Sequence, residues 1–170
     1  MDALLHLDGL SPSEATAELV RCCGSARWVE RMIAARPFLA KERLFATAES
    51  TWNDLDPEDW REAFTHHPKI GDREALRARF ASTRQWAEGE QAGAARASGE
   101  TLDALAQANQ AYEARFGHIF IVCATGKTAA EMLGLLRARL GNDPETELRI
   151  AAGEQAKITR LRLEKLLASS

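Results

Sequence analysis

The stretch TLDALAQANQAYEARFG, residues 101–117, indicates the class of fold. Its larger side chains recur every three or four positions, the period of one helix face: Leu102, Leu105, Asn109, Tyr112 and Phe116. Gly117 follows at the position where a glycine commonly ends a helix in the left-handed conformation. The stretch therefore predicts a long helix with one apolar face.

The segment that follows this helix is apolar, and the sequence offers no second β-strand that could pair with it. Residues 119–122 read Ile-Phe-Ile-Val and have strand propensity, yet the sequence contains no second convincing strand to pair with them. We therefore expect residues 119–124 to form a buried extended link. Two more helices are predicted beyond it, one that ends at Gly141 and one that begins at Asp143-Pro144 and runs to about Leu167.

The first part of the chain also contains residues that are typical of helix N-termini. Residues 11–14, Ser-Pro-Ser-Glu, form a capping box that predicts a first helix, and Ser25 is placed to begin a second. The second helix should stop near Arg36, because a proline disfavours helical geometry in the residue before it. A third is expected from about Phe38 towards Trp52, and Asp56-Pro57 repeats the cap-plus-proline signal for a short helix.

Between these parts we expect a charged helix over about residues 73–80 and another capped by Ser82 or Thr83. The sequence as a whole predicts an all-α protein, a single compact bundle of about eight helices. With 170 residues and no linker or repeat, residues 1–170 should form one domain.

Composition limits the kinds of partner. Apolar residues make up 45% and charged residues 28%, which is typical of a globular protein. A net charge of −3 gives no broad basic field, so we expect neither nucleic acid nor an anionic membrane surface as a partner. The sequence leaves the oligomeric state open, with a homodimer among the alternatives.

Cysteine usage points to a reducing compartment. The three cysteines are odd in number and two of them, Cys22 and Cys23, are adjacent, so no disulfide framework is implied. The first ten residues lack a basic region, and no apolar run is long enough to span a bilayer. We therefore predict a cytoplasmic protein.

Several short motifs fail on inspection. Gly126-Lys127-Thr128 looks like the end of a phosphate-binding loop, but Ile121 stands where that motif needs a glycine, so a polar turn capped by Thr125 or Thr128 is expected. The histidines and cysteines lack the spacing of a metal site, and no serine has the surroundings of a nucleophile elbow. We expect no metal and no covalent catalysis.

Three polar residues stand out, each with two interpretations. Pro68 restricts His67 to an extended conformation at a helix exit, which suits proton transfer but also suits an ordinary turn residue. On a helix, Glu90 would lie in line with the apolar or small side chains of Trp86 and Ala94, where a carboxylate is unusual. The other interpretation is that Glu90 lies on an ordinary solvated helix face. Arg162 lies on the apolar side of the last helix. Its guanidinium could bind an anion, or its methylene groups could cover the core while the guanidinium reaches solvent.

Four ordered blocks resemble the 2-oxo-4-hydroxy-4-carboxy-5-ureidoimidazoline (OHCU) decarboxylase family. The similarity spans nearly the whole chain. The blocks are FTHHPKIG at 64–71, GEQAG at 89–93, NQAYEARFGHIFIVCA at 109–124 and KITRLRLE at 157–164.

This resemblance implies a set of site residues. The catalytic histidine falls on His67 and its partner glutamate on Glu90. The residues implied to contact the substrate are Pro68, Ala87, Gln91 and Arg162, together with the backbone of Phe120, Ile121, Val122, Cys123 and Ala124. Ala87 stands where the family usually has serine, so one hydroxyl contact is missing or is supplied by a neighbour.

The resemblance also implies the reaction, a cofactor-independent decarboxylation of OHCU to (S)-allantoin in urate catabolism. The residue types suit this chemistry, with His67 as general acid, Glu90 as hydrogen-bond acceptor, Gln91 as partner of the ureido amide and Arg162 as stabiliser of negative charge. Two alternatives remain: a helical module that binds a partner helix, and a hydrolase of a related ureide.

Overall fold

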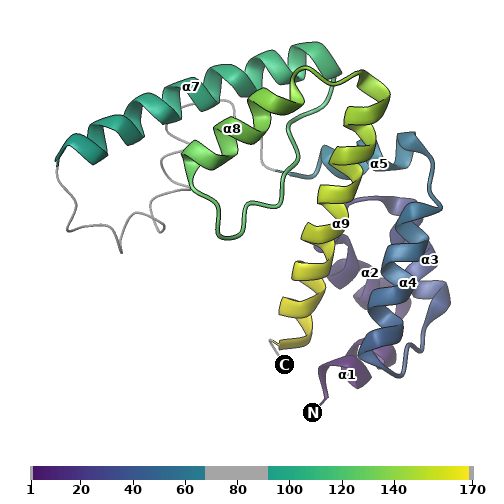
Figure 1. Ribbon diagram of the computed structural model, residues 1–170. Coiled ribbons are helices and arrows are strands. Elements are labelled where there is room, and N and C mark those ends of the chain that lie inside the picture. Colours follow the sequence, from purple (N-terminus) through teal and green to yellow (C-terminus); the bar gives the residue numbers. More distant parts are fainter. Residues whose placement is uncertain (1, 68–91, 169–170) are drawn as a thin grey trace. The chain divides into compact units, whose positions relative to one another are not determined.

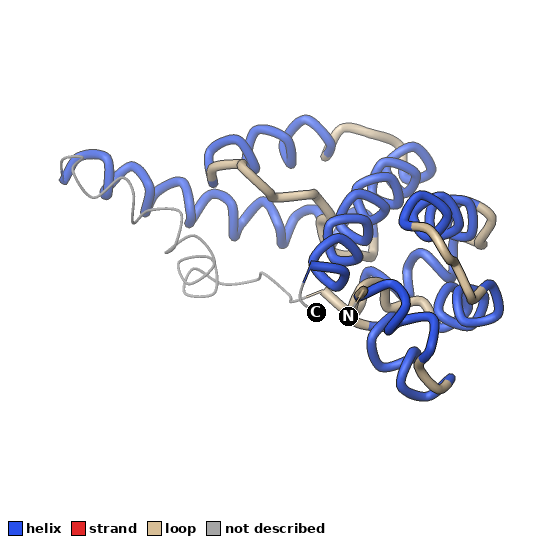
Figure 2. Tube along the Cα trace, turned by 90° about the horizontal axis from the view of Figure 1, so that it is seen from below, coloured by secondary structure: helices blue, strands red, loops and turns tan. Residues whose placement is uncertain are grey.

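The computed structural model describes residues 2–67 and 92–168, and these residues are all-α (Figures 1 and 2). Within them lie eight helices and no strand, which confirms the predicted class. The helices are α1 Ala3–Gly9, α2 Pro12–Val20, α3 Ala26–Ala35, α4 Lys41–Asn53, α5 Pro57–Phe64, α7 Ala92–Phe116, α8 Ala129–Arg139 and α9 Pro144–Ala168. The two helices expected near residues 73–80 and after Ser82 lie outside the described residues.

The predicted caps are present as side-chain to backbone hydrogen bonds. Ser11 and Glu14 form the reciprocal capping box of α2, and the Ser25 hydroxyl accepts from the Trp28 amide at the start of α3. Asp56 and Asp59 cap α5 in the same reciprocal way. Each cap satisfies amides that have no partner within the helix, which is why these starts were readable from sequence alone.

Two details of the N-terminal part differ from the prediction. The sequence analysis did not predict helix α1. This helix is short, and its N-terminal signal is a single cap, in which the Asp2 carboxylate accepts a hydrogen bond from the Leu4 amide. The third predicted helix was placed too early, because α4 begins at Lys41 rather than near Phe38. The Asp8 carboxylate accepts the amides of Phe38 and Leu39 at 2.8 and 3.0 Å, which holds this segment in a loop.

The chain divides into two compact units, which are described separately. The first, unit 1, comprises residues 1–67 and 152–170, and the second, unit 2, comprises residues 68–151. In unit 1 the indole N–H groups of three tryptophans donate to backbone carbonyls. The pairs are Trp28 to Ala48 at 3.1 Å, Trp52 to Ala152 at 2.9 Å, and Trp60 to Trp52 at 3.0 Å. These bonds tie α3 to α4, α4 to α9 and α5 to α4.

Unit 2 is built on α7, α8 and the segment between them. Gly117 ends α7 with φ +78°, and the Thr128 hydroxyl accepts from the Glu131 amide to begin α8, as predicted. Residues 119–124 are neither helix nor strand, and Ile121 and Val122 are buried. The segment is thus a link without helix or strand, as predicted, while residues 119, 120, 123 and 124 are only partly buried.

Among residues 2–67 and 92–168, no helix has the length and apolar content that a membrane crossing needs. The same residues contain no group of three or more His, Cys, Asp or Glu side chains placed to hold a metal ion.

Candidate active site

His67 lies at the end of the short turn that follows α5. Phe64, the last residue of the helix, is 1% exposed and anchors it in the core of unit 1. The amides of His66 and His67 donate to the carbonyls of Ala63 and Phe64 at 3.1 and 3.3 Å, so the backbone leaves the helix in a hydrogen-bonded turn. Sequence analysis predicted this placement of the histidine pair at a helix exit.

The two adjacent histidines have different neighbours. His66 packs against the backbone of Gly24, where an added Cβ would lie 2.3 Å from the His66 Cγ. His67 instead meets Gln155 of α9 through its Nε2 and the Gln155 Oε1. The two rings are thus committed to different parts of unit 1.

Gln155 begins a line of polar contacts on one face of α9. Its Nε2 donates to the Thr159 Oγ1 at 3.0 Å, and both side chains are buried, at 0% and 5% exposure. Gln155, Thr159 and Arg162 are spaced by four and three residues, so they share one side of the helix. A buried amide is costly unless both ends are satisfied, and here His67 and Thr159 satisfy them.

The line continues to two buried thiols in the segment between α2 and α3. Cys22 and Cys23 are 3% and 0% exposed, and the Thr159 side chain acts to lower the pKa of the Cys23 thiol. Burial raises the pKa of each thiol to about 11, and the nearby charge of Arg162 opposes this rise only partly. Both thiols are therefore protonated at neutral pH and are poor nucleophiles.

In unit 2 the extended segment is held by a cation from α8. Arg139 donates from Nη1 to the Ile121 carbonyl at 2.8 Å, and its guanidinium lies 4.5 Å from the centre of the Phe120 ring. Farther along, the Lys127 ammonium donates to the Cys123 carbonyl at 2.8 Å. The path of this backbone is thus fixed by charged donors as well as by packing.

Arg139 is itself held by Glu147, which is 0% exposed and lies in the first part of α9. The Arg139 Nε donates to both carboxylate oxygens, at 3.1 and 2.9 Å, and the Tyr112 hydroxyl and the Asn142 amide donate to the same carboxylate. Burial alone would raise the pKa of Glu147, but these hydrogen bonds hold it below its ordinary value. The carboxylate therefore stays ionised and fully satisfied.

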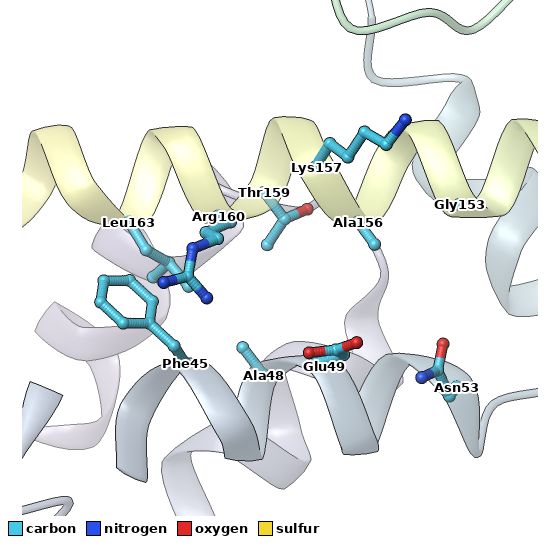
Figure 3. A pocket seen from close by; sticks show the side chains of 10 residues that line it. All are labelled: Phe45, Ala48, Glu49, Asn53, Gly153, Ala156, Lys157, Thr159, Arg160 and Leu163. Carbon is cyan, nitrogen blue, oxygen red and sulfur yellow. The ribbon is translucent and has the colours of Figure 1, made fainter. Parts of the chain in front are cut away.

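Unit 1 also has a groove of about 310 Å³ between α4 and α9 (Figure 3). Glu49 and Asn53 lie on its α4 side, while Thr159 and Arg160 lie on its α9 side. The Arg160 guanidinium lies 4.4 Å from the centre of the Phe45 ring. None of the described residues that line this groove belongs to the predicted site.

The predicted site residues fall into three groups. His67 and Arg162 lie in unit 1, and residues 120–124 lie in unit 2. Pro68, Ala87, Glu90 and Gln91 lie outside the described residues. Among the predicted site side chains that the structure describes, His67 and Arg162 thus share a unit, which is not the unit of the backbone of residues 120–124. The roles assigned to all of these residues stay predictions.

Two polar groups next to the predicted residues were missed by sequence reasoning. Gln155 and Thr159 precede Arg162 on the same face of α9, so helical spacing from Arg162 was a usable signal. The pair of Arg139 and Glu147 joins two different helices, and nothing in the local sequence indicates that the two side chains meet.

Comparison with known proteins gives a consistent result. Residues 8–164 match the family model described as OHCU decarboxylase. A curated protein of Arabidopsis thaliana, the uric acid degradation bifunctional protein TTL, is 38% identical over 147 residues, which are 86% of this chain and 45% of that protein. The 2-oxo-4-hydroxy-4-carboxy-5-ureidoimidazoline decarboxylase of Amia calva is 28% identical over 79% of this chain and 76% of its own length.

A solved structure is similar in fold as well as in sequence. The crystal structure of an OHCU decarboxylase in the presence of (S)-allantoin superimposes with a TM-score of 0.72 and 38% identity, covering 89% of this chain and 98% of that one. The chain spans less than half the length of the plant bifunctional protein.

Proposed function

The chain belongs to the OHCU decarboxylase family, and from this membership we propose that it converts OHCU to (S)-allantoin with loss of carbon dioxide. The observation that carries the proposal is the family match over residues 8–164. The urate-degradation names of the relatives and the solved structure with (S)-allantoin support the same substrate class.

The chemistry requires a carbon–carbon bond to break, a carbon–hydrogen bond to form, and the ring hydroxyl to become a carbonyl as its proton passes to the ring nitrogen. The bond between the ring carbon and its carboxylate breaks, carbon dioxide leaves, and the electron pair spreads into the imidazoline ring. The neighbouring ring carbon, which carries the ureido group, then captures a proton, which we assign to His67 as general acid. The hydroxyl on the carbon that lost the carboxylate gives up its proton and becomes the ring carbonyl of allantoin. The fixed turn of residues 65–67 supports this role, since a proton donor must be held in one geometry.

The remaining roles are assigned by residue type. Arg162 stabilises negative charge that develops on the ring, and Glu90 accepts hydrogen bonds from ureido or hydroxyl donors. Gln91 complements the ureido amide with one donor and one acceptor. The backbone of residues 120–124 holds the ring, with Pro68 and Ala87 in contact with the substrate.

The reaction as proposed needs neither a metal nor an organic cofactor. A freshly generated OHCU solution tests the function directly, by release of carbon dioxide and circular dichroism of the product. We expect carbon dioxide to be released faster than in buffer. The circular dichroism of the product should have the same sign and shape as that of authentic (S)-allantoin. A rate and an optical activity no greater than in buffer would refute the proposal.

Other outcomes of this experiment identify the alternatives. Consumption of a related ureide without release of carbon dioxide would indicate a hydrolase. A chain that leaves OHCU unchanged but binds an amphipathic helix would be an interaction module.

We also infer a cytoplasmic location and a single functional domain over residues 1–170. The three free cysteines support a reducing compartment. The lack of nucleic-acid binding stays a prediction, and the oligomeric state stays open, with a homodimer among the alternatives. Sedimentation with and without added nucleic acid tests both.

A further inference from the structure

The contact between His67 and Gln155 contains information about which imidazole nitrogen carries hydrogen. A glutamine amide has one donor end and one acceptor end. Gln155 uses its donor end on Thr159, at 3.0 Å, and its Oε1 faces the His67 Nε2. Because a carbonyl oxygen only accepts, the His67 Nε2 must carry a hydrogen in this arrangement.

The opposite arrangement is consistent with a neutral ring only. A flipped amide would donate to an unprotonated Nε2 and would accept from the Thr159 hydroxyl. A general acid, however, is doubly protonated before it acts, and both nitrogens of an imidazolium are donors. The Gln155 Oε1 is then the end that matches Nε2 in the doubly protonated ring, and equally in a neutral ring that keeps its hydrogen on Nε2.

Burial makes a flip during each turnover costly. The Gln155 side chain is 0% exposed, and Thr159, one turn farther along α9, is 5% exposed. Rotating the amide would break two buried hydrogen bonds that water cannot replace. The orientation that serves the acid form is therefore the one that persists.

We propose that Gln155, oriented by Thr159, is a positioning residue that keeps a hydrogen on Nε2 of His67 and holds the imidazole ring in one orientation. The catalytic meaning of this assignment rests on the proposed function, since it takes His67 as the general acid. Thr159 acts one step farther away, by accepting from the Gln155 amide.

Nitrogen-15 NMR of the histidine rings tests the assignment without substrate. The His67 signals are identified by their loss in His67→Asn, and spectra are taken at a pH where the ring is neutral. In the parent protein we expect the Nε2–H form with a directly observable Nε2 proton, protected from exchange by Gln155. In Gln155→Leu this proton should exchange with water and its signal should disappear, whereas Gln155→Glu, which keeps an acceptor, should retain it.

Two results would overturn the proposal. One is an Nδ1–H form of His67 in the parent protein. The other is a protected Nε2 proton that survives in Gln155→Leu. Retention of the parent circular dichroism and melting behaviour by Gln155→Glu keeps the comparison free of unfolding.

Kinetics supply the second measurement. Gln155→Leu should lower kcat roughly tenfold to a hundredfold with little change in KM, a part of the ~10²–10⁴-fold that general acid catalysis contributes. Gln155→Glu should recover most of that loss, and Thr159→Val should show a smaller loss in kcat. The control is Gln107→Leu, the same substitution at an exposed position of α7, which should change neither parameter. An unchanged kcat in Gln155→Leu contradicts the positioning role.

The two measurements separate this inference from the proposed function. If the tautomer and its dependence on Gln155 are as expected but OHCU is not consumed, the proposed function fails and the positioning stands as a structural fact. If OHCU is decarboxylated and the Nε2 proton is absent, the positioning role fails alone.

Discussion

At the scale of single residues, His67 and Gln155 are 88 positions apart in sequence and yet share a hydrogen bond. Sequence analysis selected His67 because of the proline after it, a local signal. Gln155 was not selected, because its role depends on a partner that only the folded chain supplies. Residues that act through their neighbours are in general harder to find from sequence than residues in distinctive local motifs.

The handedness of the product should depend on His67. A single acid held in one geometry delivers its proton to one face of the ring carbon, so His67→Ala and His67→Asn should yield allantoin with little optical activity above the unassisted reaction. Circular dichroism during turnover is the measurement. His67→Asn keeps polar volume, so a failure shared by both variants points to proton transfer rather than to packing. Parent-rate formation of (S)-allantoin by either variant would remove His67 from the mechanism.

Gly24 should tolerate no side chain. Its added Cβ would lie 2.3 Å from the His66 Cγ, so Gly24→Ala must displace the turn that carries both histidines. Overpacking of this kind costs about 1–3 kcal/mol, which denaturant unfolding measures. The matched control is Gly153→Ala in α9, where nothing lies within 4 Å of the added Cβ and helix propensity favours alanine by about 1 kcal/mol. Equal effects at the two sites would contradict the packing seen at Gly24.

At the scale of elements, the sequence was informative wherever a helix start depends on nearby side chains. Ser11, Ser25, Asp56 and Thr128 each bond to an amide within three residues, and each was readable in advance. The start of α4 was misplaced because Asp8, 30 residues away, holds Phe38 in a loop. Distance along the chain, rather than strength of the contact, decided what was predictable.

The buried pair of Arg139 and Glu147 should be important for stability. Glu147→Gln leaves Arg139 buried at 8% exposure without its counter-charge, and loss of one partner of such a pair costs about 3–5 kcal/mol. Chemical denaturation measures the loss. Glu145→Gln, two residues earlier, is the control, because the Glu145 carboxylate pairs with Arg149 in an exposed position and its removal should change stability little. A small loss in Glu147→Gln would mean that the network is dispensable.

The same carboxylate predicts how stability varies with pH. The folded pKa of Glu147 lies below the ordinary value of 4.5, so the unfolded chain binds more protons in the acid range. Its contribution should be fully present above about pH 4.5 and should be lost as the pH falls towards the lower folded pKa. Unfolding free energies measured between pH 3 and 7, with pH as the only variable, test this, and Glu147→Gln should show a flatter acid limb than the parent. Parallel curves for the two proteins would contradict the assignment.

At the scale of the whole molecule, unit 1 is assembled from the two ends of the chain. Its first 67 residues pack with residues from 152 onwards, and the Trp52 indole bonds to the Ala152 carbonyl across 100 positions. A variant that ends at residue 151 should therefore lose the packing of Trp52, seen as a red-shifted and solvent-quenched tryptophan fluorescence. A variant that ends at residue 167 removes only terminal residues and should behave as the parent. A native fluorescence spectrum in the shorter variant would show that residues 2–67 pack without α9.

This arrangement has a consequence for the order of events during synthesis. The ribosome produces the segment with His67 long before it produces Gln155, so the histidine turn emerges without the amide that meets it. Residues 68–151 form their own unit and are completed in the interval. Contacts between distant positions form slowly, so the apolar faces of the first helices stay uncovered until α9 emerges. During that time these helices must avoid aggregation. Synthesis of α9, rather than of the turn at His67, is therefore the step after which the contact between His67 and Gln155 can form.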